Sequence, residues 1–210
     1  ALGYIAGKNE VAVIAFHDAD IITYNKVFLS RLIFPVMNLG FQFSKGYYIR
    51  YKTKFYGRVT RLFYFPLIRT LKDILGTTAF LDYLGDFRYP LSGEFATFVS
   101  QARLLRYPSD WGIEVGLLSE IYRIVRVSQV CQVELTERYD HKHQEVGTGT
   151  DKGINKMATD IARTFFSHLS SNGVILTRDM LSTIRLTYLR HARESVGIYE
   201  SYAKMYRNII

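Results

Sequence analysis

The apolar run Val11-Ala12-Val13-Ile14-Ala15-Phe16, followed at once by His17-Asp18-Ala19-Asp20, decides the fold of this chain. Six apolar residues in succession are typical of a buried strand, and in an α/β protein the carboxyl end of a strand opens onto the ligand crevice. An Asp-x-Asp pair placed there offers oxygen ligands to a hard divalent cation and leaves coordination sites for phosphate oxygens. The same pattern is compatible with a solvated Asp18 and with Asp20 beginning a turn, so the motif alone leaves both interpretations open.

Short apolar runs alternate with longer helical patterns along the rest of the chain, which indicates an α/β protein. The sequence predicts strands at 11–16, 41–51 and 127–135, and helices at 25–35, 57–75, from Glu94 onward, and at 112–125, 152–170 and 177–207. From 151 onward the pattern is helical only, and Asn172-Gly173 separates its two helices. We therefore expect an α/β domain at 1–150 and a helical extension at 151–210 that packs on this body or against a second subunit.

Composition narrows the class of protein. The 210 residues are 48% hydrophobic and 22% charged, which is ordinary globular composition, and no apolar run is long enough to span a bilayer. The net charge of +8 favours anionic partners, but the 27 Lys and Arg residues are dispersed and match no nucleic-acid-binding motif. We therefore expect small phosphorylated ligands, and neither a nucleic acid nor a membrane, as partners. The single cysteine, Cys131, favours a reducing, cytoplasmic setting.

Six segments, taken in order, carry a resemblance to one family. They are His17-Asp18-Ala19-Asp20-Ile21, Ser44-Lys45-Gly46-Tyr47-Tyr48, Gly57-Arg58-Val59-Thr60-Arg61, Phe87-Arg88-Tyr89-Pro90-Leu91-Ser92-Gly93-Glu94, Asp110-Trp111-Gly112-Ile113-Glu114 and Tyr139-Asp140-His141-Lys142-His143. Together they resemble the glucosyl-3-phosphoglycerate synthases and their mannosyl relatives, which are retaining GT-A glycosyltransferases. The resemblance implies a Rossmann-like GT-A fold that is incomplete at the N-terminus, because in that family a portion binding the nucleotide comes before the segment that begins here.

The resemblance also implies a divalent metal, Mg²⁺ or possibly Mn²⁺ or Co²⁺, held by Asp20 and His141. Asp18 would orient donor hydroxyls or metal-bound water. On sequence alone, His141 and His143 are compatible with two surface histidines of a charged loop. The sequence does not decide which of the two binds metal. We take His141 as the ligand and place His143 on the acceptor side.

The acceptor site is expected at Gly57, Arg58, Val59 and Thr60. Glycine lets the backbone approach an anion closely, the free N–H groups at a helix start point toward it, and the Arg58 guanidinium can pair two phosphate oxygens. An ordinary helix start with a solvated arginine would show the same residues. The resemblance implies that the acceptor is 3-phosphoglycerate.

The donor site is expected at Leu91, Ser92, Gly93 and Trp111, which resemble the family's turn under the donor sugar and its sugar-facing helix start. Glu114 and Asp20 are the candidate catalytic residues. We assign Glu114 to positioning beside the transferred hexose; taken alone, it is also a carboxylate favoured by a helix N-terminus.

The expected activity is transfer of glucose from a UDP- or GDP-linked donor to 3-phosphoglycerate, by an enzyme that acts as a homodimer. Two alternatives remain open: a mannosyl-3-phosphoglycerate synthase, and a non-catalytic α/β assembly fragment whose tail helices dimerise.

Overall fold

The computed structural model describes residues 12–48, 57–136, 139–140 and 153–207 of the chain. Its strands are β1 (Val13–Phe16), β2 (Phe43–Tyr48), β3 (Phe95–Phe98) and β4 (Val130–Thr136). Its helices are α2 (Lys26–Asn38), α3 (Phe65–Leu75), α4 (Ala79–Gly85), α5 (Val99–Ala102), α6 (Ile113–Ile124), α7 (Gly153–Ser171) and α8 (Arg178–Arg207), with a π-helical turn η1 (Thr60–Tyr64) before α3 and a 3₁₀ turn η2 (Val127–Gln129) before β4.

The four strands form one mixed sheet in the order β1-β3-β2-β4. β3 runs antiparallel to both of its neighbours, with Ala15 opposite Ala96 and Ser44 opposite Ala96, whereas β2 and β4 are parallel. Parallel strands need a crossover connection, here supplied by the helices between residues 57 and 124. The carboxyl ends of β1, β2 and β4 therefore deliver the residues that follow them to the same side of the sheet.

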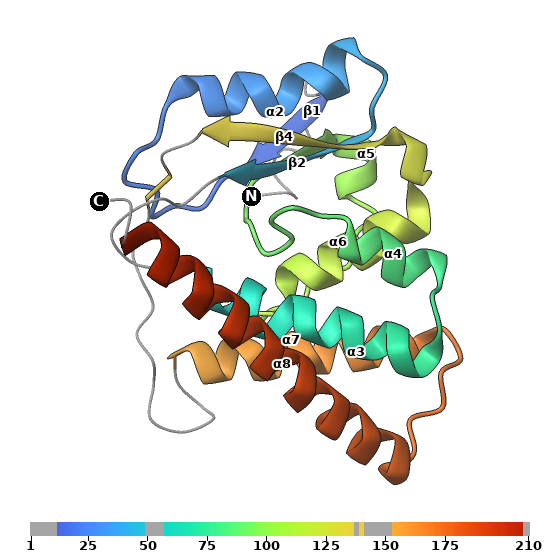
Figure 1. Ribbon diagram of the computed structural model, residues 1–210. Helices are drawn as coiled ribbons and strands as arrows, with labels where there is room; N and C mark the ends of the chain where they lie inside the picture. The colour runs from blue at the N-terminus through green and yellow to red at the C-terminus, as the bar shows by residue number, and fades with distance from the viewer. Residues whose placement is uncertain (1–11, 49–56, 137–138, 141–152, 208–210) are drawn as a thin grey trace.

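Two hydrophobic clusters hold helices to the two faces of the sheet. α2 covers one face through Phe28, Leu32 and Val36, which are buried together with Tyr48, Ala96, Leu135 and Tyr139 (Figure 1). The larger cluster lies on the other face, where α3, α4, α6 and α7 contribute its buried side chains. Asn25 caps α2 by accepting a hydrogen bond from the Val27 N–H at 2.9 Å, as its residue type predicts.

Three expectations for secondary structure are wrong. Glu94 begins no helix: β3 follows it, because Phe95–Phe98 pair on both sides with β1 and β2, and this pairing overrides local preference. α2 does not end near Pro35 but continues to Asn38, since proline removes only one backbone donor while Pro35 and Val36 are buried. α4 lies in a stretch for which the sequence predicts no helix, and Thr78 caps it.

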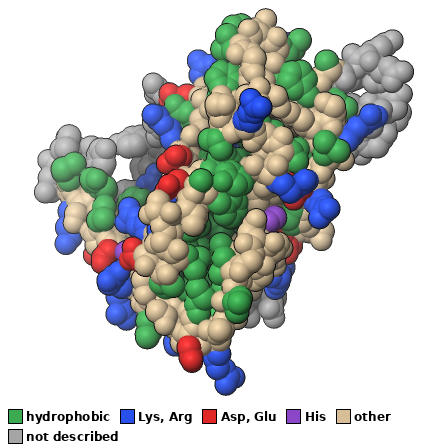
Figure 2. Space-filling view, turned by 90° about the vertical axis from the view of Figure 1, so that its right-hand side faces the viewer, with side chains coloured by type: hydrophobic (Ala, Val, Ile, Leu, Met, Phe, Trp, Pro, Cys, Tyr) green, Lys and Arg blue, Asp and Glu red, His purple; other side chains and the backbone are tan. Residues whose placement is uncertain are grey.

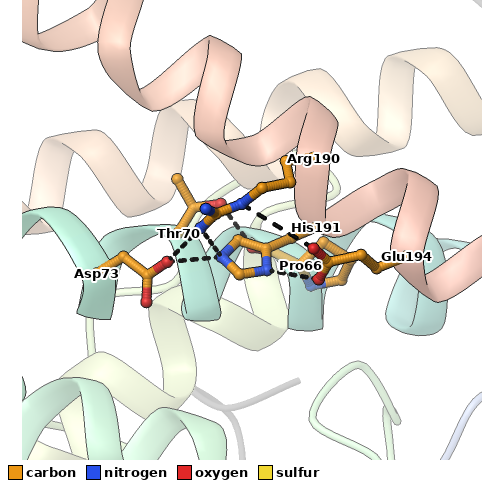
Figure 3. A network of polar contacts seen from close by, with 6 residues as sticks. All are labelled: Pro66, Thr70, Asp73, Arg190, His191 and Glu194. Atoms are coloured by element: carbon orange, nitrogen blue, oxygen red, sulfur yellow. Dashed lines mark hydrogen bonds and ion pairs between the residues drawn. The ribbon is translucent and has the colours of Figure 1, made fainter.

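The helical tail is anchored to the body by core and polar contacts. Ile161, Phe165 and Leu169 of α7 and Ile184 of α8 belong to the larger cluster. Figure 3 shows the polar clamp between α8 and α3: His191 Nε2 lies 2.8 Å from Asp73 Oδ2, and the Arg190 guanidinium lies 2.8 Å from the same oxygen. The division at residue 150 stays a prediction, but the described part of the tail shares its core with the body.

The surface combines charged residues with exposed hydrophobic ones. A band of hydrophobic side chains runs down the face seen in Figure 2, with charged side chains on both flanks. Within the described residues, no helix has the length and apolar character that crossing a bilayer requires.

Candidate active site

Asp18 and Glu94 meet at the carboxyl end of β1. The Asp18 backbone N–H lies 3.4 Å from Glu94 Oε1, and Glu94 is fully buried while Asp18 is half-buried and Asp20 exposed. Gly93 makes this approach possible, because a Cβ at that position would lie 1.9 Å from Asp18 Oδ1. The structure thus brings three predicted residues, Asp18, Asp20 and Gly93, to one place.

Lys45 lies beneath this acidic group with only 1% of its surface exposed. Its ammonium donates a hydrogen bond to the Ser92 carbonyl, and the Ser92 hydroxyl donates to the Gly46 carbonyl at 2.6 Å. β2 and the turn before β3 are therefore tied together directly under the predicted donor-binding residue Ser92. The lysine supplies a positive charge that acts on three carboxyl groups, those of Glu114, Glu94 and Asp18.

Burial sets the protonation of this cluster. It lowers the pKa of Lys45 to about 8, although the Glu114, Glu94 and Asp18 charges oppose the shift. It raises the pKa of Glu94 to about 7, and the Asp18 charge adds to that effect. It also raises the pKa of Glu114, in the first turn of α6, to about 7. Carboxyl groups whose pKa is raised to about 7 are typical of functional sites.

A layer of tyrosine rings covers Glu94. Tyr139 donates its hydroxyl hydrogen bond to Glu94 Oε1, and its ring stacks on Tyr48 with centroids 3.5 Å apart and planes 2° from parallel. Tyr89 also packs against Tyr48, with ring centroids 4.7 Å apart. Glu94 Oε2 is buried and has no hydrogen-bond partner among the described residues, which is an uncommon state for a carboxylate oxygen.

The segment that leads to His141 returns to the loop after Asp20. The Ile22 N–H donates to the Asp140 carbonyl at 2.8 Å, and the Asp140 N–H donates to Thr23 Oγ1 at 3.1 Å. His141 and His143 themselves lie outside the described residues. The structure thus places Asp140, the residue before His141, at the loop that follows Asp20. The convergence of Asp20 and His141 on one cation stays a prediction.

The donor atoms near Asp20 fit a hard cation in kind, because Asp18 and Asp20 present carboxylate oxygens on one tight turn. Across the described part of the chain, no group of three or more His, Cys, Asp and Glu residues is arranged to hold a metal. A ligand set built from these residues would therefore need His141, phosphate oxygens or water in addition to the carboxylates.

A pocket of about 570 Å³ borders the tyrosine layer. Its wall includes Tyr48 and Tyr89 and also Thr60, Arg61 and Arg88. Gly57, with φ of 76°, lies against it, since a Cβ there would be 3.4 Å from the Tyr89 hydroxyl. The predicted acceptor segment thus reaches this pocket through Thr60, while Val59 is buried beside it and Arg58 is exposed.

The remaining predicted donor residues lie around the start of α6 and before β3. Trp111 is 39% exposed beside Gly112, whose N–H donates to Asp110 Oδ1 at 2.9 Å and so begins the helix that carries Glu114. Leu91 packs partly against the larger core cluster. No described contact assigns Leu91 or Trp111 to a sugar, so their donor role stays a prediction.

Several residues of the site carried no predicted role, among them Lys45, Tyr139 and Arg88. For Lys45 a signal was present, because a lysine between Phe43 and Tyr47 in a strand pattern is expected to be buried only with charged partners. Nothing local indicates that Tyr139 reaches Glu94, because 45 positions separate them. Arg88 is brought to the pocket by the turn that Gln132 holds.

No family model matches this chain. Among curated proteins it is 46% identical over 203 residues to the glucosyl-3-phosphoglycerate synthase of Persephonella marina, covering 96% of this chain and 50% of that protein. It is 40% identical over 198 residues to the synthase of Methanococcoides burtonii, covering 91% of this chain and 48% of that protein. The chain thus spans about half the length of the curated relatives it matches.

Solved structures of the same synthases resemble this chain in fold. The glucosyl-3-phosphoglycerate synthase of Mycobacterium tuberculosis, in complex with Mn²⁺, UDP-glucose and phosphoglyceric acid, matches with a TM-score of 0.59 at 26% identity, covering 75% of this chain and 49% of that one. A complex of the same synthase with Mg²⁺ and UDP matches equally well, with a TM-score of 0.59. In sequence and in its GT-A fold, the chain is therefore a homologue of the glucosyl-3-phosphoglycerate synthases over about half of their length.

Proposed function

We propose that this chain forms the metal, donor-sugar and acceptor region of a retaining glycosyltransferase that moves glucose from a nucleoside diphosphate glucose to 3-phosphoglycerate. One observation carries the proposal: the Asp18–Glu94 cluster and a pocket lined by arginines border the same tyrosines, since Tyr139 bonds Glu94 and stacks on Tyr48, which lines the pocket. A donor at the cluster and an anionic acceptor in the pocket would therefore be neighbours. The relatives' names favour glucose over mannose as the transferred sugar.

In the proposed reaction the bond between the anomeric carbon and the diphosphate oxygen breaks, and a bond to the acceptor hydroxyl oxygen forms. The hydroxyl proton passes to the departing diphosphate. A divalent cation at Asp20 and His141 would neutralise the charge that grows on that diphosphate. Glu114 and Asp18 hold hexose hydroxyls, Leu91, Ser92, Gly93 and Trp111 line the donor, and Gly57–Thr60 with His143 bind the acceptor. Homodimerisation through the tail and a cytoplasmic location complete the proposal.

The test uses the full-length protein with Mg²⁺, 3-phosphoglycerate and a panel of UDP- and GDP-linked glucose and mannose. We expect a glucosyl-3-phosphoglycerate product with the donor's anomeric configuration, identified by mass spectrometry and NMR. Asp20→Ala should abolish the transfer, and chelation of the metal should do the same. Asp179→Ala, at an exposed position in the first turn of α8, is the matched control and should transfer normally. Metal-dependent transfer that survives in Asp20→Ala would refute the proposal.

A further inference from the structure

The acceptor-side pocket carries two cationic groups, from two different elements. Arg61 belongs to the π-helical turn that continues the Gly57–Thr60 segment, and Arg88 belongs to the turn that precedes β3. Glu134 is the single carboxylate in the described wall, so the described charges of the pocket sum to one positive unit. The pocket therefore favours an anionic ligand.

Each guanidinium is held against a tyrosine ring. Arg61 lies over Tyr199 at 5.2 Å, so α8 of the helical tail provides part of this wall. Arg88 lies over the Tyr47 ring at 4.9 Å, and its Nη1 donates to the Tyr47 hydroxyl at 3.2 Å. Stacking on a ring fixes the plane of a guanidinium, while the N–H donors along the edge of that plane can still face a ligand.

The backbone of Arg88 is also fixed. Its N–H donates to Gln132 Oε1 at 2.8 Å, and Gln132 Nε2 donates to the Asp86 carbonyl at 3.0 Å. A side chain of β4 thus holds both sides of the turn that carries Arg88. A cation supported in this way is pre-organised to bind a ligand, unlike a surface arginine whose side chain is only solvated.

The chemistry of the proposed acceptor explains why two separate cations are useful. In 3-phosphoglycerate the reacting hydroxyl lies on the carbon between the carboxylate and the carbon that bears the phosphate. Binding the phosphate alone leaves the hydroxyl free to swing, whereas binding both anionic ends fixes it toward the donor. The Gly57–Thr60 helix start is the proposed phosphate site, so the second anion needs a cation on another element.

Resting on the function proposed above, we propose that Arg88 is a specificity-determining residue that binds the carboxylate of a phosphoglycerate acceptor. A guanidinium pairs a carboxylate through two parallel hydrogen bonds, which a neutral group at the same carbon cannot form. Arg88 therefore selects acceptors that carry a carboxylate beside the reacting hydroxyl. Arg61 and Tyr199 form the opposite part of the pocket.

The experiment compares two ligands that share the phosphate and differ in the carboxylate. Steady-state kinetics of the full-length protein and its variants give KM and kcat with the phosphoglycerate acceptor, and competition gives the inhibition constant of glycerol 3-phosphate. We expect Arg88→Gln to raise the acceptor KM about tenfold or more, with the turnover rate changed by less than about threefold. The inhibition constant of glycerol 3-phosphate should stay unchanged. Arg88→Lys should recover part of the loss.

Arg126→Gln is the matched control, because this exposed arginine lies just before β4, at the end of that strand remote from Glu134 and the pocket. A KM for Arg88→Gln equal to that of the control would overturn the proposal. So would an equal loss of affinity for both ligands, since that pattern indicates a general effect of charge or folding. If the wild-type protein transfers no hexose to 3-phosphoglycerate, the proposed function itself fails, and its failure is seen before any variant is made.

Discussion

Lys45 is a charged side chain in a position that sequence rules normally assign to an apolar one. It is 1% exposed, and the charges of Glu114, Glu94 and Asp18 all act to keep it protonated. A buried ammonium is tolerated only with such compensation, and the buried carboxyl groups need the ammonium in return. The residue therefore compensates the charge of the acidic cluster.

Replacing Lys45 by methionine tests this role. Lys45→Met keeps a long unbranched side chain and leaves the carboxyl groups without this cation, so we expect the free energy of unfolding to fall by about 3 kcal/mol. Proposed hexose transfer should fall with it. Denaturant unfolding and initial rates measure the two effects, and Lys26→Met at the exposed start of α2 is the control. A stability equal to wild type would contradict the compensation argument.

Among the elements, α7 shows how the helical tail is joined to the donor side of the body. Asp160 is 2% exposed and accepts from Lys156 at 2.5 Å and from Arg163 at 2.9 Å. Arg163 also reaches Asp110, in the turn that starts α6, at 3.4 Å. The hydrogen bond from Lys156, followed by that from Arg163, holds the pKa of Asp160 below its ordinary value of 3.8, although burial opposes this.

This carboxyl group gives a pH-dependent prediction. A depressed native pKa contributes stability that is present above the unfolded pKa and is lost as pH falls through the native one. Asp160→Asn should therefore lower the unfolding free energy by about 1 kcal/mol at neutral pH. The gap to wild type should close below about pH 4. Urea titrations across this range measure it, with Asp179→Asn at an exposed position of α8 as control; a gap that widens in acid would refute the assignment.

At the scale of the molecule, one side of α8 packs on α3 while other positions expose large apolar side chains. Leu186 is 66% exposed and Val196 is 41% exposed, and their spacing of ten residues places them about 80° apart around the helix axis. Exposed apolar residues on a long helix are suited to a two-fold interface with a second copy.

We expect the proposed homodimer to depend on these exposed apolar residues of α8. The double substitution Leu186→Lys with Val196→Lys should shift the protein toward the monomer in analytical ultracentrifugation, with an unchanged circular dichroism spectrum. Ile175→Lys is the control, because Ile175 is 80% exposed in the connection between α7 and α8. A dimer that survives the double substitution would place the interface elsewhere.

Several features were predictable because their physical cause is local. The apolar run before Asp18 predicted β1, and Asn172-Gly173 predicted the break between α7 and α8. The cap of α2 was predicted at Thr23 or Asn25, and Asn25 provides it. Six ordered motifs also predicted the relationship to the glucosyl-3-phosphoglycerate synthases. Residue type and spacing carry this information directly.

The tertiary structure decided what depends on distant partners. Glu94 precedes a strand because β1 and β2 pair with the two edges of β3. The residues next to Glu94 in the sequence are equally compatible with the start of a helix. Lys45 acquires a role only when Ser92 comes within hydrogen-bonding distance, and Arg88 only when Gln132 of β4 anchors its turn. Local sequence states which groups are present, whereas burial and charge compensation arise between segments that only the folded chain brings together.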